Sequence, residues 1–340
     1  MSITPKSRFN WPIVGHRGIV KYLKHCLEAG NIAQAYLFAG PAHLGKRFLA
    51  EILVNSLVCK SFHKKDGELV PCGVCECCRQ LKNQVHPDVY WLKREVSEKS
   101  EKRKKNIGID QIRELQNKLN LCSFLNSFKI AVIDEAETLS QDAANSLLKT
   151  LEEPTKNTVI ILLAENTAFL PKTIVSRCQT LKFLPAANQE IFDHLLTLKV
   201  ERKKAKLLAA LAAGRPGLAL TYLNSPQTYL TFEDEVKQFL TFLRGNIAGR
   251  FKLAGGLADA EAAKAILAVW RRVLRDLLLI KAGAPQAVSN LNLSAELEEI
   301  ARDFSGQKLM RILAALEASQ KYLAGNVNPK LVLENLALIF

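Results

Sequence analysis

The sequence has no apolar stretch long enough to cross a membrane. Its longest uninterrupted apolar run covers only residues 207–213, whereas a membrane-spanning helix needs ~18 or more apolar residues. Residues 1–11 also lack the apolar core of a secretory signal. These absences favour a cytoplasmic protein without a membrane partner. Because disulfides are rare in that reducing compartment, the eight cysteines are expected to be thiols or metal ligands.

Acidic side chains are scarce relative to basic ones. The 340 residues include 33 Asp and Glu but 47 Lys and Arg, which gives a net charge of +14. Such an excess favours a polyanionic partner such as DNA, although solvated lysines also simply keep a protein soluble. Part of the excess lies in a charged segment at residues 93–106, in which Val96 is the one apolar residue. This segment is expected to be a flexible surface insertion.

The chain contains no internal repeat and no low-complexity tract, and its pattern changes near the middle. The first half alternates helical patterns with apolar strand patterns, and strands are expected at 35–39, 89–92, 129–134, 158–164 and 179–183. Continuous apolar strands alternating with helices predict an α/β fold, in which a parallel sheet carries helices on both faces. From residue 188 onward the pattern is helical. We therefore place domain boundaries near residues 184 and 227.

A phosphate-binding loop follows the first of these strands. Residues 40–47 match G-x-x-x-x-G-K-[ST] at every position except the last. In such a loop Gly40 and Gly45 let backbone N–H groups approach phosphate oxygens, and Lys46 reaches the β- and γ-phosphates. Arg47 stands where a hydroxyl would bind Mg²⁺, and its guanidinium would pair with phosphate but repel the metal. We expect weak binding of ATP or ADP and impaired binding of Mg²⁺.

An acidic pair ends the apolar strand at residues 129–134. In phosphate-loop enzymes an Asp at such a strand end binds Mg²⁺ or its water shell, and a neighbouring Glu orients the attacking water. Asp134 and Glu135 occupy these two places. The alternative is an acidic strand terminus without a chemical role. Beside a phosphate loop, the pattern favours a degenerate catalytic motif.

A cluster of cysteines predicts a zinc knuckle at residues 59–78. The spacing is C-x12-C-x2-C-x2-C, and the short C-x2-C steps let thiolates converge on one tetrahedral ion. The expected Zn²⁺ ligands are Cys59, Cys72, Cys75 and Cys78. Cys77 is a further thiol that could replace a neighbour. Four thiolates close the coordination shell, so the zinc would be structural rather than catalytic.

In combination, these motifs resemble the clamp-loader branch of the AAA+ ATPases. A further motif that carries the resemblance is Ser176-Arg177-Cys178, between two expected strands. The similarity is dense over residues 10–183 and continues in the C-terminal half mainly as a pattern of helices. The stretches that carry it lie at residues 14–16, 35–41, 86–88, 134–137, 145–154, 176–179 and 324–329, together with the cysteine segment.

The resemblance implies a three-part architecture and a role in an assembly. It implies an AAA+ domain over residues 1–183, a small helical lid over 184–226, and an all-α collar over 227–340 that supports oligomerisation. The implied partners are other clamp-loader subunits, namely an ATPase subunit and a delta-type subunit, with the sliding clamp and primer–template DNA within the assembly. Arg177 would serve as an arginine finger in the ATP site of a neighbouring subunit.

Three positions depart from a working ATPase of this family. Besides Arg47, Ala164 stands where active relatives carry a polar sensor, and Gly217 stands where they carry a second sensor, an arginine. Each departure removes a group that would detect the γ-phosphate or its metal. Loss of metal contacts slows phosphoryl transfer strongly. The sequence therefore predicts a subunit with weak or absent ATPase activity that helps to load the clamp during replication.

Two other functions are compatible with parts of the sequence. One is an active, ATP-hydrolysing clamp-loader motor, against which the three departures argue. The other is a zinc-containing nucleic-acid-binding module outside the replisome, which would explain the basic charge and the cysteines but not the ordered series of ATPase motifs. A loader subunit should enter a defined hetero-oligomer under native conditions, and a solitary module should not.

Overall fold

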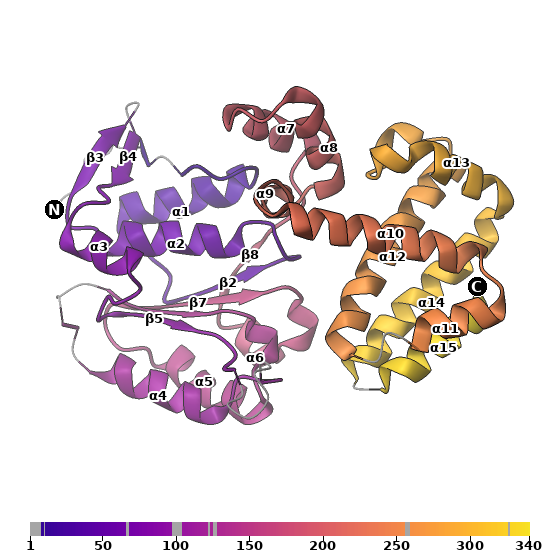
Figure 1. Ribbon diagram of the computed structural model, residues 1–340. Coiled ribbons are helices and arrows are strands. Elements are labelled where there is room, and N and C mark those ends of the chain that lie inside the picture. The colour runs from indigo at the N-terminus through magenta and orange to yellow at the C-terminus, as the bar shows by residue number, and fades with distance from the viewer. Residues whose placement is uncertain are drawn as a thin grey trace. The chain divides into compact units, whose positions relative to one another are not determined.

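The computed structural model of the protein describes residues 8–9, 11–65, 68–96, 104–121, 123–124, 128–255, 259–325 and 327–340. The chain forms two compact units, residues 1–190 and 191–340 (Figure 1). Residues 97–103 of the charged segment lie outside the described residues.

The described part of the first unit is built on a five-stranded parallel sheet. The strand order is β5-β6-β7-β2-β8. The strands are β5 (Val89–Leu92), β6 (Lys129–Ile133), β7 (Thr158–Ala164), β2 (Ala35–Ala39) and β8 (Gln179–Lys182). In the central register Leu37 lies opposite Leu162, and Ala131 lies opposite Ile160. Every residue of β2, β6 and β7 is buried, as expected for a sheet covered on both sides.

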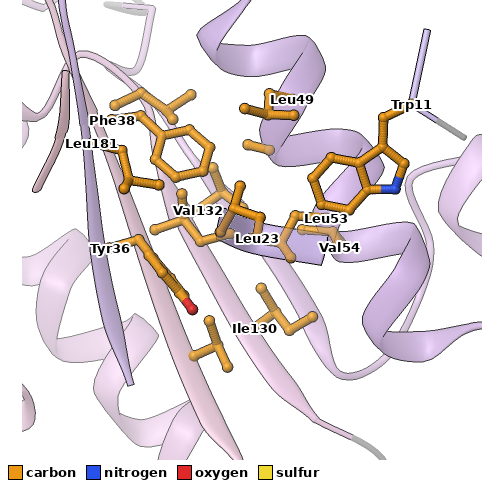
Figure 2. Packing of buried hydrophobic residues seen from close by; sticks show 14 of the residues in the cluster. Trp11, Leu23, Tyr36, Phe38, Leu49, Leu53, Val54, Ile130, Val132 and Leu181 are labelled. Atoms are coloured by element: carbon orange, nitrogen blue, oxygen red, sulfur yellow. The ribbon is translucent and has the colours of Figure 1, made fainter. Parts of the chain in front are cut away.

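Strand residues alternate between two apolar cores, one on each face of the sheet. Tyr36 and Phe38 of β2 enter the core under helices α1 (Arg17–Ala29) and α2 (Lys46–Val58), where Leu23 and Leu49 meet them (Figure 2). Leu37 enters the opposite core, because successive strand residues point to opposite faces. That core lies under α4 (Ile109–Asn120), α5 (Gln141–Glu152) and the short α6 (Lys172–Val175). The predicted α/β architecture is confirmed.

Helix boundaries follow local capping signals. Ser140 Oγ accepts the Ala143 N–H at 3.2 Å and starts α5. At α4, Gln111 Oε1 accepts the Gly108 N–H at 3.2 Å. Two single turns of 3₁₀ helix, η1 (Ala136–Thr138) and η2 (Thr167–Phe169), follow β6 and β7.

The cysteine segment contributes two of the three strands of a second, small sheet in the first unit. Its strand order is β1 (Arg8–Phe9), β4 (Glu68–Pro71) and β3 (Phe62–Lys65), and β3 pairs with β4 antiparallel. Helix α3 (Glu76–Lys82) follows. The cysteines are therefore placed by a hairpin on one side and by a short helix on the other.

The second unit is helical throughout its described residues. Helix α7 (Asn188–Thr197) runs across the boundary between the units. The helices that follow are α8 (Arg202–Ala212), α9 (Pro216–Asn224), α10 (Pro226–Arg244), α11 (Ile247–Gly255), α12 (Ala260–Lys281), η3 (Pro285–Ala287), η4 (Leu291–Leu293), α13 (Ser294–Asp303), α14 (Gly306–Ala324) and α15 (Pro329–Ile339). None of the described helices is both long enough and apolar enough to cross a membrane.

An aromatic cluster forms part of the core of the second unit. The Trp270 ring of α12 lies 4.7 Å from Phe242 and 5.1 Å from Phe239, between ring centroids, and Phe340 packs edge-on against both phenylalanines. The last helix, α15, begins after Asn328, whose Oδ1 accepts the Lys330 N–H at 2.9 Å. The predicted boundary between lid and collar near residue 227 stays a prediction.

Candidate nucleotide site and metal centre

The phosphate loop connects β2 to α2 and is held from the core side. Gly40 has φ +150°, and a Cβ there would overlap the carbonyl oxygen of Phe183. Gly45 has φ +88° at the start of α2, a conformation that favours glycine. The His16 ring packs on Phe183, and its Nε2 lies 2.9 Å from the Leu44 carbonyl oxygen. Burial lowers the pKa of His16 and favours the neutral ring.

Lys46 turns back onto its own loop. Its side chain is buried, and Nζ donates to the carbonyl oxygens of Gly40 and, at 2.8 Å, of Pro41. Burial lowers the pKa of this ammonium, and the acidic side chains of Glu165, Glu137 and Asp134 oppose that shift. The cation that would reach phosphate is therefore already satisfied by backbone oxygens.

Arg47 forms an ion pair with Asp134, whose carboxylate a magnesium ion would otherwise bind. Its Nη1 donates to Asp134 Oδ2 at 3.1 Å, and its Nε donates to Glu51 Oε1 at 3.2 Å. The guanidinium also lies over the Trp91 ring, 5.1 Å from the centroid, within cation–π range. A positive charge thus replaces both the missing hydroxyl and the ion beside it. This arrangement does not fit Mg²⁺.

Glu135, the second acidic residue of the motif, also forms an ion pair with an arginine. Glu135 has φ +55° at the end of the loop after β6. Its carboxylate accepts two bonds from Arg94, at 2.6 Å from Nε and at 3.1 Å from Nη2. Such a two-point pair is among the stronger side-chain interactions. A carboxylate held in this way is poorly placed to orient a water molecule.

Arg177 lies apart from this cluster, between α6 and β8. Its Nη1 donates to the Thr173 carbonyl oxygen at 3.0 Å, and its Nη2 lies 2.5 Å from Glu152 Oε1 at the end of α5. The side chains of Arg177 and Glu152 are 37% and 47% exposed. The guanidinium is therefore on the surface of the first unit.

Four cysteine sulfurs converge as the spacing predicts. The Sγ atoms of Cys59, Cys72, Cys75 and Cys78 all lie within 4.8 Å of one another. Cys72 Sγ lies 3.8 Å from Cys59 Sγ and 3.9 Å from Cys78 Sγ. A tetrahedral zinc ion with Zn–S bonds of about 2.3 Å has sulfur–sulfur edges of about 3.8 Å. The donor set therefore fits one Zn²⁺.

Cys77 does not compete with these four thiols. It is fully buried and packs in the apolar core beneath α1 and α2. Burial raises the pKa of the Cys59 and Cys78 thiols, which disfavours thiolates until a cation offsets the charge. Burial also raises the pKa of Cys75, but hydrogen bonds from neighbouring backbone and thiol groups outweigh it and lower the pKa to about 6.

Comparison with known proteins identifies the family. A family model described as DNA polymerase III, delta subunit, matches residues 15–187, just over half of the chain. A second model, for the C-terminal part of the delta subunit, matches residues 234–340. The chain belongs to the DNA polymerase III delta-subunit family. The predicted clamp-loader resemblance is confirmed.

Curated relatives of this delta-family chain are subunits of DNA polymerase III. The delta' subunit of Bacillus subtilis is 28% identical over 94% of this chain and 94% of its own length. The delta' subunit of Haemophilus influenzae is 35% identical over 65% of this chain and 63% of its own length. The tau subunit of B. subtilis is 27% identical over 95% of this chain, and the match spans only 59% of tau.

Solved structures give a similar but weaker likeness. A gamma subunit-related protein of DNA polymerase III from Thermotoga maritima is 18% identical to this delta-family chain. The alignment covers 93% of this chain and 97% of that one, with a TM-score of 0.48.

The structure of this delta-family chain brings most of the predicted nucleotide-site residues together, namely Gly40, Gly45, Lys46, Arg47 and Asp134, with Glu135 beside them. Two residues near this site, Arg94 and Glu137, are not among the predicted site residues. Arg94 lies in the charge-rich segment that predicts a solvated insertion, and no local pattern around it indicates a pair with Glu135. Glu137 Oε1 accepts the Glu165 N–H at 3.1 Å, and burial raises the pKa of Glu137. The sequence feature that could have indicated its place near the site is its position two residues after Glu135.

Proposed function

We propose that this chain is a clamp-loader subunit that hydrolyses ATP weakly or not at all. It would act in the cytoplasm with an ATPase subunit and a delta-type subunit to load the sliding clamp on primer–template DNA. The observation that carries the proposal is the ion pair between Arg47 and Asp134, with Nη1 and Oδ2 3.1 Å apart. This pair places a fixed cation where hydrolysis requires a metal ion.

Other positions around the loop support the same conclusion. Ala164 ends β7, the strand between the phosphate-loop strand and the Asp134 strand, and carries no polar atom on its side chain. Arg94 neutralises Glu135. In the second unit Gly217 lies in the first turn of α9 and offers no guanidinium. Each missing group weakens transition-state stabilisation, and about 1.36 kcal/mol corresponds to a tenfold change in rate.

The same proposal gives Arg177 a role in another subunit's site. Its ion pair with Glu152 joins two side chains that are 37% and 47% exposed, and such pairs contribute only about 0–1 kcal/mol. The guanidinium can therefore leave Glu152 for a phosphate at modest cost. A finger of this kind accelerates hydrolysis by about 10³–10⁵ in comparable NTPases.

The first experiment reconstitutes the loader with an Arg177→Ala subunit. The matched control is Lys172→Ala, which removes an exposed cation from α6, the short helix that precedes Arg177. The Arg177 variant should assemble normally but lower the steady-state ATPase activity, because the adjacent site loses its finger. Unchanged ATPase activity in a correctly assembled complex would remove Arg177 from the mechanism.

The second experiment uses the isolated chain. Wild type should hydrolyse ATP no faster than a Lys46→Ala variant, since neither supports metal-dependent turnover. Weak binding of ATP or ADP without turnover agrees with the proposal. A clear excess of wild-type activity over the variant would show a working phosphate loop and contradict it.

We also infer that the cysteine cluster holds a structural Zn²⁺. The support is the sulfur geometry, which matches a tetrahedral ion, and the closed set of four thiolates, which leaves no position for a substrate. The ion would hold the hairpin β3–β4 against α3.

A further inference from the structure

Helix α8 belongs to the second unit (Figure 1), and a dense group of basic residues lies at its beginning. Residues 199–206 contain five basic residues and one acidic residue, Glu201. All five basic residues are exposed, namely Lys199, Arg202, Lys203, Lys204 and Lys206. We call this group the α8 basic face. Four of its cations lie within about 6 Å along the helix axis, at a rise of about 1.5 Å per residue.

Local helix physics disfavours this arrangement. The first turn of α8 has no acidic residue, and the N-cap residue Glu201 makes no side-chain cap hydrogen bond. Cations near the positive N-terminus of a helix are unfavourable, and so is the like-charge pair of Arg202 and Lys206 at positions i and i+4. The helix forms because its other face is buried, through residues such as Ala205, Leu208 and Ala212.

The charges of the α8 basic face are not neutralised within the described part of the chain. Lys199, Lys203, Lys204 and Lys206 make no ion pair with any described residue. Arg202 lies over the Phe192 ring of α7, 5.6 Å from its centroid. The neighbouring helix α9 carries no charged residue at all. The face thus presents unpaired positive charge that a partner could neutralise.

We propose that the α8 basic face binds the phosphate backbone of duplex DNA. The basic side chains of α8 point in several directions, because successive helical residues are rotated by about 100°. Duplex DNA carries phosphates on both strands, with one negative charge per about 1.7 Å of axis, so it can contact several of these cations at once, whereas an extended acidic peptide places its side chains on alternating faces. Contacts of this kind position DNA without reading its sequence. The proposal rests on the proposed function only for the choice of DNA among polyanions.

The test measures the salt dependence of binding to a labelled short duplex by fluorescence anisotropy, with the isolated full-length chain. One variant carries Lys203→Gln, Lys204→Gln and Lys206→Gln. The matched control carries the same change at three exposed lysines elsewhere in the second unit, Lys252, Lys281 and Lys321. Both variants lose the same net charge. Removing like charges from the start of α8 should not unfold the chain, and thermal unfolding checks this.

Each lost phosphate contact should reduce the slope of log affinity against log salt by about 0.9. The α8 variant loses three such contacts, so its slope should be about 2.7 smaller than that of wild type. When salt rises from about 50 to about 200 mM, both proteins bind more weakly, but the factor by which affinity falls should be about 40 times smaller for the variant than for wild type. The control should keep the wild-type slope. Equal slopes for the two variants would overturn the proposal.

A second arm separates DNA from an acidic protein. If the α8 variant loses binding to a poly-glutamate peptide but keeps the wild-type slope on DNA, the face serves an acidic protein and the proposal fails. Failure of the reconstituted loader to respond to Arg177→Ala would contradict the proposed function instead. That result would leave the binding measurement on the isolated chain unaffected, so the two failures can be told apart.

Discussion

Replacing Arg47 by serine should make nucleotide binding depend on Mg²⁺. The substitution supplies the hydroxyl that the loop lacks and releases Asp134 from its ion pair. In wild type a divalent ion on Asp134 would meet the guanidinium directly. The Nη1–Oδ2 distance is 3.1 Å, and a Mg²⁺–oxygen bond is about 2.1 Å, so the two cations would be at most about 5.2 Å apart.

The size of this repulsion follows from Coulomb's law. For charges of +2 and +1 at about 5.2 Å, the repulsion is about 1.6 kcal/mol at the dielectric constant of water and about 6 kcal/mol at the value of 20 that suits groups near a protein surface. The Arg47 side chain is 49% exposed, so the smaller value is the safer estimate. A repulsion of about 1.6 kcal/mol lowers the affinity for the ion by more than about tenfold.

Calorimetric titration of a non-hydrolysable ATP analogue, with Mg²⁺ and with EDTA, measures the effect. Wild type should bind equally well under both conditions, whereas Arg47→Ser should bind more than about tenfold better with Mg²⁺. Glu51→Gln is the control, because it removes the other partner of Arg47 and leaves the pair with Asp134 in place. A folded Arg47→Ser variant with the same affinity in Mg²⁺ and EDTA would refute the reasoning.

Two further predictions concern the metal centre and a buried acid. Purified protein should contain one equivalent of zinc. Cys72→Ser should lower both the zinc content and the melting temperature. Cys77→Ser should keep the metal but lose about 1–3 kcal/mol of stability, because it buries a hydroxyl group. Metal analysis with the reverse pattern would contradict the assigned ligands. Because burial raises the pKa of Glu137 above its usual 4.5, this carboxyl lowers stability as the pH rises above that value. Glu137→Gln should therefore raise the urea midpoint at neutral pH, with an advantage that shrinks toward pH 4.5; a constant advantage would argue against titration of Glu137.

The sequence predicted features that depend on local patterns. A continuous apolar strand such as residues 35–39, with helical patterns before and after it, predicts a parallel sheet that is covered on both faces, and the structure places Tyr36 and Leu37 in different cores. The C-x2-C steps bring sulfurs together because a short knuckle and one helical turn suffice. The helix caps formed by Ser140 and Asn328 are local in the same way, because each involves only a few adjacent residues.

Pairings across long stretches of sequence could not be predicted in this way. Arg47 and Asp134 are 87 positions apart, and Arg94 and Glu135 are 41 apart. Each pair exists because the order of strands in the sheet brings together the segments that follow two different strands, and strand order is not encoded in either segment alone. The hairpin β3–β4 was missed for a different reason. The dipeptide Asp66-Gly67 is a strong hairpin signal, but the flanking strands are short and rich in charged residues, so they lack the apolar pattern of a strand.

The way in which the phosphate loop is held has a consequence for how such a chain can change over time. Gly40 fits against Phe183, and Lys46 fills the loop with its own ammonium group. A loop supported by protein atoms alone needs no ligand to keep its form. Substitutions at the metal-binding positions of this domain can therefore accumulate without loss of the loop's conformation.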